Sequence, residues 1–251
     1  MIRIEQLTRR FGGLSAVDNV TLLIPSRFIT GVIGPNGAGK TTLLSLLAGQ
    51  LRPHGGRILL DGGRIDGLPA HRLHTLGLAR TFQIPRPFRR LSVLENLLLA
   101  RPAQEGERLA AALFRPRRVA AAERGAMRRA RALLEDLRLA EVADAPAGEL
   151  SGGQHKLLEL ARALMASPRL LLLDEPCAGL NPAAIGFLSE TIARLRNDGM
   201  TFVIVEHNVD FVGRHCDDVV VMAQGRVLAQ GAPDAVRRDP RVLDAFLGDA
   251  A

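Results

Sequence analysis

The sequence contains two cysteines, two lysines and no long uninterrupted run of apolar residues. Cys177 and Cys216 cannot build a disulfide framework and lack the spacing of metal ligands, so we expect two packed thiols. No apolar run approaches the ~18 residues that a membrane-spanning helix needs, and Met1 to Glu5 shows no signal-peptide pattern. The composition therefore predicts a cytosolic chain. Its 251 residues suffice for one large α/β domain or two small lobes around a shared core.

The net charge of +7 is unevenly distributed. The segment from Arg101 to Arg131 holds nine arginines against three glutamates, and lysine occurs only at positions 40 and 156. A basic chain can bind nucleic acid or an anionic membrane surface. Because one segment carries most of the excess, we expect no nucleic-acid partner. We expect the region from Arg101 to about Arg138 to be helical and set apart from the sheet, with a break at 115–118.

A glycine-rich stretch joins an apolar strand, 28–33, to a helix over 43–48. It fits the phosphate-loop pattern G-x-x-x-x-G-K-[ST] in the required order of strand, loop and helix. Glycines let backbone N–H groups face phosphate oxygens, and the helix N-terminus adds a positive dipole end. Lys40 would reach the β- and γ-phosphates and Thr41 would bind Mg²⁺. The predicted nucleotide-binding residues here are Gly34, Pro35, Asn36, Gly37, Ala38, Gly39, Lys40, Thr41 and Thr42.

Two further apolar runs end in polar residues. Leu170 to Leu173 predicts a buried strand, and Asp174 and Glu175 follow it at the end where open α/β sheets bind ligands. Beside a phosphate loop, Asp174 would hold Mg²⁺ and Glu175 would accept a proton from the attacking water. The strand 201–205 leads to His207, which could contact a γ-phosphate, although a lone histidine is more often a surface residue.

Two other stretches could also contact a nucleotide. The predicted strands 2–7 and 17–24 form an antiparallel pair, and Phe11 at their turn either stacks on a base or packs the hairpin. Ser151, Gly152, Gly153 and Gln154 precede a predicted helix over 155–166, which makes a second anion site possible. Ser92 and Glu95 predict a capping box.

The order of these motifs resembles the ATP-binding cassette of ABC transporters along the whole chain. The resemblance implies an α/β P-loop NTPase cassette with a mixed RecA-like core sheet, an N-terminal antiparallel β subdomain and an inserted α-helical subdomain. It implies a single domain over 1–251, with the helical subdomain at approximately 84–165. The cofactors would be ATP and Mg²⁺.

The same resemblance implies roles for residues whose own patterns are ambiguous. Phe11 matches the adenine-stacking aromatic, Glu175 the catalytic base and His207 the switch histidine. Gln83 matches the glutamine that senses Mg²⁺ and faces the membrane subunit, so the implied metal ligands are Thr41, Gln83 and Asp174. In the family two cassettes meet head to tail, and each signature, here Ser151 to Gln154, contacts the ATP of the other. Closure on ATP and opening after hydrolysis would drive transport.

Several short segments of the sequence are most similar to ATPase subunits of branched-chain amino acid importers: 11–17, 68–72, 79–83, 178–182 and 243–248. The expected partners are a second cassette, two transmembrane permease subunits and, indirectly, a substrate-binding protein, with the chain on the cytoplasmic face of the inner membrane. Alternatives are a lipid or lipopolysaccharide exporter cassette, a urea importer cassette, or a soluble cassette acting on nucleic acid or ribosomes. Asn181 departs from the aspartate that most cassettes carry there.

Overall fold

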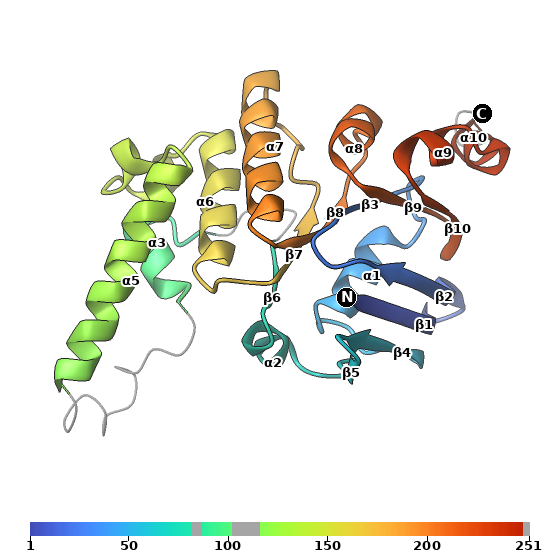
Figure 1. Cartoon of the computed structure of the whole chain (residues 1–251), viewed down its shortest axis with the longest axis horizontal. Helices are drawn as coiled ribbons and strands as arrows, with labels where there is room; N and C mark the ends of the chain where they lie inside the picture. Colours follow the sequence, from blue (N-terminus) through green and yellow to red (C-terminus); the bar gives the residue numbers. More distant parts are fainter. Residues whose placement is uncertain (82–86, 102–115, 248–251) are drawn as a thin grey trace. The chain divides into compact units, whose positions relative to one another are not determined.

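The computed structural model describes residues 1–81, 87–101 and 116–247 of the chain, which divides into two compact units (Figure 1). The first unit comprises Met1–Gln83, Arg169–Ala178 and Ser189–Ala251. The second comprises Ile84–Pro168 and Gly179–Leu188. Helix α7 (Pro182–Asn197) contains one of the boundaries between them. The described helices include none that is both long enough and apolar enough to cross a membrane.

A mixed six-stranded sheet organises the first unit, in the order β10-β9-β3-β8-β7-β6. The strands β3, β6, β7, β8 and β9 run parallel to one another, and β10 pairs antiparallel with β9. Every residue of β3, β7 and β8 is buried, as expected for parallel strands that are covered on both faces. The bounds are β3 (Ile29–Ile33), β6 (Leu78–Arg80), β7 (Leu170–Asp174), β8 (Thr201–Val205), β9 (Asp218–Ala223) and β10 (Arg226–Gly231).

The second sheet of this unit is antiparallel, in the order β2-β1-β4-β5. Its strands are β1 (Ile2–Phe11), β2 (Leu14–Ile24), β4 (Gly55–Leu60) and β5 (Gly63–Arg64). In β1 and β2 apolar residues that face the core alternate with exposed positions, which is the pattern of a sheet with one solvated face. The predicted mixed core sheet and antiparallel N-terminal sheet are therefore confirmed.

The main core of the first unit surrounds α1 (Lys40–Leu47). Four leucines of this helix, at 43, 44, 46 and 47, are buried among side chains of both sheets. The burial of these four leucines explains why so short a helix is stable, since propensity alone does not hold eight residues helical. The packing fixes the helix N-terminus directly after the loop that ends β3.

Other helices complete this unit. They are α2 (Ala70–Thr75), α8 (Val209–His215), α9 (Pro233–Arg237), α10 (Pro240–Leu247) and the part of α7 from residue 189 onward. Helix α8 lies against β3, where a Cβ built on Gly31 would come within 2.9 Å of Val212 Cγ1 and Cys216 Sγ. The sequence did not lead us to predict α8. Its seven residues are too few for a periodic signal, but the Asn208 side chain caps it by accepting from the Phe211 N–H.

The second unit is helical. Its main helices are α3 (Val93–Leu99), α5 (Pro116–Asp136) and α6 (Gly152–Leu164), with the short 3₁₀ turns η2 (Ala140–Val142) and η3 (Ala147–Glu149). Helix α5 buries a stripe of Ala126, Ala130 and Leu134 at four-residue spacing. It begins at Pro116, so the break expected at 115–118 does not extend to 116–118. The predicted helical, arginine-coated segment is confirmed for its described part.

Candidate nucleotide-binding site

The predicted phosphate loop connects β3 to α1 through a backbone that only glycine adopts easily. Gly34 has φ +148° and Gly39 has φ +97°. A Cβ on Gly34 would lie 2.0 Å from the Met222 carbonyl oxygen, and one on Gly39 would lie 2.1 Å from that of Ala16. Both positions therefore require glycine for conformation and for close approach. The Gly225 N–H also donates to the Ala38 carbonyl at 3.1 Å, which fastens the loop to the β9–β10 turn.

Lys40 is the first residue of α1 and is only 6% exposed. Its Nζ donates to the carbonyl oxygens of Gly34 (2.7 Å) and Pro35 (2.8 Å), so the ammonium group closes the loop from inside. Burial lowers the pKa of Lys40, and the negative charges of Glu175 and Asp174 oppose that shift. The structure thus brings the loop lysine and the two predicted carboxylates into one electrostatic environment.

Asp174 ends β7 and is 1% exposed. Its Oδ2 accepts a 2.8 Å hydrogen bond from Arg80 Nη2. Among the residues that the structure describes, its buried Oδ1 has no hydrogen-bond partner. A buried carboxylate oxygen without a donor is costly unless a cation or water satisfies it. Asp174 therefore offers one free ligand oxygen.

The unpartnered Oδ1 of Asp174 is where a magnesium ion could bind. Thr41 follows Lys40 at the exposed start of α1, in the same unit as Asp174. No cluster of three or more His, Cys, Asp and Glu side chains suitable for a metal occurs in the described parts of the chain. Mg²⁺ binds through one or two protein oxygens together with substrate phosphates and water. The residues present fit that mode, with Asp174 and Thr41 as ligands.

Glu175 and His207 meet at the ends of neighbouring strands. Glu175 follows β7 with φ +48°, an uncommon value for a residue other than glycine, and its N–H donates to the Val205 carbonyl at 2.9 Å. His207 Nε2 lies 3.0 Å from Glu175 Oε1. The side chains are 20% and 46% exposed, so both face an accessible region. An imidazole and a carboxylate in contact can position water and transfer a proton.

Sequence reasoning gave no role to Glu206, although it adjoins His207. Its carboxylate is buried and accepts three backbone N–H groups, from Cys177 (2.7 Å), His207 (3.1 Å) and Asn208 (3.4 Å). These bonds fix the chain after Glu175 to the chain around His207. A charged residue that ends a buried strand was the available signal.

Arg80 is the other site residue that sequence reasoning missed. Its side chain is 9% exposed and ends β6 beside Asp174. Nη1 donates to Ser45 Oγ (2.9 Å), within α1, and to Gln50 Oε1 (2.6 Å), just after that helix. One guanidinium therefore joins the helix of the phosphate loop to the acidic end of β7.

In the second unit, Ser151 caps α6 by a complete capping box. Ser151 Oγ accepts from the Gln154 N–H (3.3 Å), and Gln154 Oε1 accepts from the Ser151 N–H (2.9 Å). Gly152 and Gly153 form the first turn, so the helix begins three residues before the predicted start at 155. The exposed Ser151 and Gly152 present a helix N-terminus, which favours an anion.

Phe11 and Gln83 are also predicted site residues. Phe11 ends β1, is 45% exposed, and has the guanidinium carbon of Arg9 4.8 Å from its ring centroid. Gln83 lies outside the described residues, so its predicted roles stay predictions.

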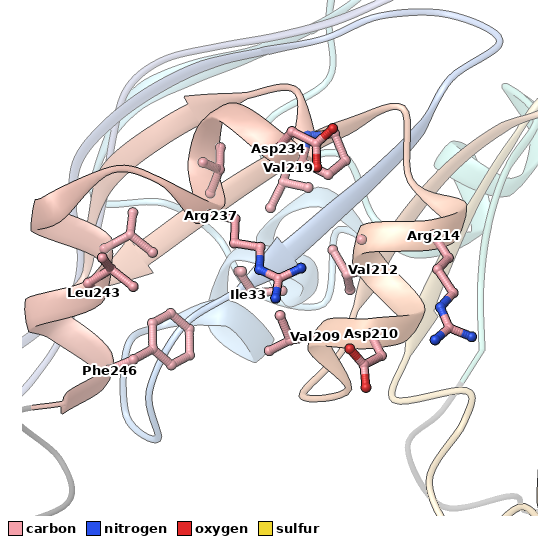
Figure 2. A pocket seen from close by; sticks show the side chains of 14 residues that line it. Ile33, Val209, Asp210, Val212, Arg214, Val219, Asp234, Arg237, Leu243 and Phe246 are labelled. Carbon is pink, nitrogen blue, oxygen red and sulfur yellow. The ribbon is translucent and has the colours of Figure 1, made fainter.

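The first unit also contains a cavity of about 470 Å³ bounded by β3, β9 and the helices α8 to α10. Its wall is mainly apolar, and Figure 2 shows Arg237 extending toward Ile33 and Val209. One lining residue, Ile33, directly precedes Gly34 of the predicted phosphate loop. The lining includes none of the predicted nucleotide-binding residues.

The fold and the phosphate loop define a class, and comparisons with known proteins agree. The family model described as ABC transporter matches residues 17–178. The crystal structure of a nucleotide-free ATP-binding cassette from an ABC transporter superimposes with a TM-score of 0.85 at 35% identity, covering 98% of each chain. A second cassette structure, of an ADP conformation, gives 0.83 at 33% identity and covers 99% of this chain and 98% of that one. The chain belongs to the ABC transporter family and is an ATP-binding ATPase of that class.

The chain is also similar to a narrower group, the ATP-binding proteins of branched-chain amino acid transport. The model described as branched-chain amino acid ATP-binding cassette transporter matches residues 226–251. The high-affinity branched-chain amino acid transport ATP-binding protein BraF of Pseudomonas aeruginosa is 43% identical over 100% of this chain and 98% of its own. The corresponding protein LivG of Escherichia coli is 41% identical with the same coverage. The predicted resemblance to this importer group is confirmed.

Proposed function

We propose that this chain is the ATP-hydrolysing subunit of an importer for branched-chain amino acids. The contact that carries the proposal is the 3.0 Å approach of His207 Nε2 to Glu175 Oε1, beside Lys40 in the same unit. The substrate class is supported by the full-length similarity to BraF and LivG and by the C-terminal family match. That the chain is one cassette domain with its helical subdomain at about 84–165 is part of the proposal.

In this proposal the phosphate loop, Gly34 to Thr42, holds the triphosphate through backbone N–H groups and Lys40. Phe11 stacks on the adenine. Thr41 and Asp174, with Gln83, hold Mg²⁺, which offsets charge on the β- and γ-phosphates when bound. Glu175 polarises the attacking water, and His207 orients Glu175 and contacts the γ-phosphate. Glu206 holds together the segments that carry these two side chains, through its three backbone contacts.

Two chains then act together. The helix N-terminus at Ser151, Gly152, Gly153 and Gln154 contacts the ATP held by a second cassette, so a lone chain hydrolyses ATP poorly. Closing on ATP and opening after hydrolysis move two permease subunits, with the chain peripheral on the cytoplasmic face of the inner membrane and a binding protein supplying the substrate.

The mechanism is tested by trapping. The Glu175→Gln variant, incubated with ATP and Mg²⁺, should elute as a dimer that retains two ATP molecules. Glu190→Gln, an exposed substitution on α7, is the matched control and should turn ATP over and stay monomeric. A Glu175→Gln protein that remains monomeric and hydrolyses ATP at the normal rate would contradict the assignment of the base.

The transport role is tested separately, by co-purification of the tagged chain from its native membranes. Two permease-like subunits with a second cassette are the expected result. Recovery of ribosomal or DNA-associated partners alone would leave the ATPase chemistry in place and overturn the transport function.

A further inference from the structure

Asp174 is the proposed magnesium ligand, yet the guanidinium group of Arg80 already pairs with one oxygen of its carboxylate. Arg80 Nη2 lies 2.8 Å from Asp174 Oδ2, and the two side chains are only 9% and 1% exposed. Removing an ion pair from water leaves its attraction little screened. The negative charge that would attract a divalent ion is therefore largely balanced before any metal arrives.

The position of Arg80 is fixed by other contacts. Its second terminal nitrogen donates to Ser45 Oγ and Gln50 Oε1, so the guanidinium is held from two directions. A planar guanidinium with several fixed donors loses little freedom on pairing and stays charged at any physiological pH. The arrangement is thus a permanent positive charge beside a carboxylate whose Oδ1 is free.

We propose that Arg80 acts as a resident counter-ion that prevents free Mg²⁺ from binding to Asp174 in the absence of nucleotide. A divalent ion at Oδ1 is repelled by the nearby guanidinium and by Lys40, and only the phosphates of ATP supply enough negative charge to overcome that repulsion. Metal therefore enters together with the nucleotide. Arg80 is a positioning residue, because it acts through Asp174. This inference rests on the proposed function.

The test measures Mn²⁺ binding by electron paramagnetic resonance, with Mn²⁺ alone as the probe and no nucleotide. Arg80→Gln removes the charge and keeps a hydrogen-bonding side chain, whereas Arg80→Lys keeps the charge and loses the planar fork. We expect the Gln variant to bind Mn²⁺ roughly tenfold or more tightly than the unsubstituted protein, and the Lys variant to bind it as weakly as that protein does. Arg80→Gln combined with Asp174→Asn should lose the gain.

A matched control is Arg196→Met, which breaks the ion pair with Asp217 in the same unit and should leave Mn²⁺ affinity unchanged. Equal affinity in the Gln variant and the unsubstituted protein, or equal gains in the Gln and Lys variants, would overturn the proposal. If Arg80→Gln does not fold, the Lys variant still decides, because a gain of Mn²⁺ affinity with the charge retained contradicts it.

A second measurement separates this inference from the proposed function. With a non-hydrolysable ATP analogue present, Asp174→Asn should weaken Mn²⁺ binding. If it does not, the proposed magnesium ligand is wrong. If it does, while Arg80→Gln shows no gain without nucleotide, only the counter-ion role fails.

Discussion

His207 Nε2 and Glu175 Oε1 lie 3.0 Å apart although 32 positions separate them in the sequence. They meet because β7 and β8 are parallel neighbours, with Asp174 opposite Val205, and because each side chain follows the end of its strand. The Glu206 carboxylate accepts from the N–H groups of Cys177 and His207, and so links the segment after Glu175 to the segment of His207. Backbone hydrogen bonds therefore hold together the two segments that carry the pair.

We expect His207→Ala to lower kcat about 100-fold or more, because losing one preorganised polar group at a transition state costs on the order of 3 kcal/mol. ATP affinity should change little, which fluorescent nucleotide titration would establish. His215→Ala is the control: the centroid of the His215 ring lies 5.0 Å from that of Phe211 on α8, and the loss of this ring should leave kcat within about twofold. A His207 variant that loses ATP affinity in parallel would indicate a binding role instead.

Two capping boxes in the second unit allow a paired comparison. Ser92 caps α3 and Ser151 caps α6 by the same reciprocal bonds. Each Ser→Ala change should lower the free energy of unfolding by about 1 kcal/mol, as measured by urea denaturation. Only Ser151→Ala should also reduce ATPase activity and the ATP-dependent dimer, since only that helix is proposed to contact nucleotide. Equal activity in both variants would argue against the proposed contact of Ser151 to Gln154 with the ATP held by a second cassette.

Phe88 is an exposed aromatic residue five positions after Gln83, and we propose that its segment receives a helix of the membrane subunit. It is 55% exposed, and the buried Asn96 holds its backbone by accepting from its N–H (2.9 Å) and donating to its carbonyl (3.1 Å). We expect Phe88→Ala to leave the basal ATPase rate unchanged and to reduce stimulation by the permease subunits at least several-fold, because aromatic anchors dominate interface energy. Leu76→Ala, which removes an exposed apolar residue of the first unit, should not alter stimulation.

Cys216 should make the folded state sensitive to alkali. Burial raises the pKa of its thiol to about 12 from an ordinary 9.0. A raised folded-state pKa gives stability that is complete below pH 9 and declines as pH rises toward 12. The unfolding free energy of the unsubstituted protein should therefore fall by up to about 1.4 kcal/mol per pH unit in this window, relative to Cys216→Ala. A difference between the two proteins that stays constant from pH 8 to 10.5 would contradict this.

The two cysteines should also be unreactive toward thiol reagents in the native protein, because both are buried. The prediction of packed thiols is confirmed by their burial.

Patterns contained within a short stretch were predictable from the sequence. The phosphate loop is contiguous, and its glycines, lysine and flanking apolar runs specify the local backbone by themselves. The same is true of the buried leucine strand β7 and the capping box at Ser92. The start of α6 was placed too late because Gly152 and Gly153 have poor helix propensity, whereas the capping box at Ser151 and Gln154 overrides it.

Contacts between distant parts of the chain were decided only by the tertiary structure. Arg80 and Asp174 are 94 positions apart, and Glu206 and Cys177 are 29 apart. Neither pair follows from composition or periodicity, because each depends on which strands are neighbours and where each strand ends. The sequence by itself determined that this protein binds the phosphates of a nucleotide. The order of β6, β7, β8 and β3 decided which charged side chains come together near the predicted phosphate loop, since only packed strands hold distant side chains within hydrogen-bonding distance.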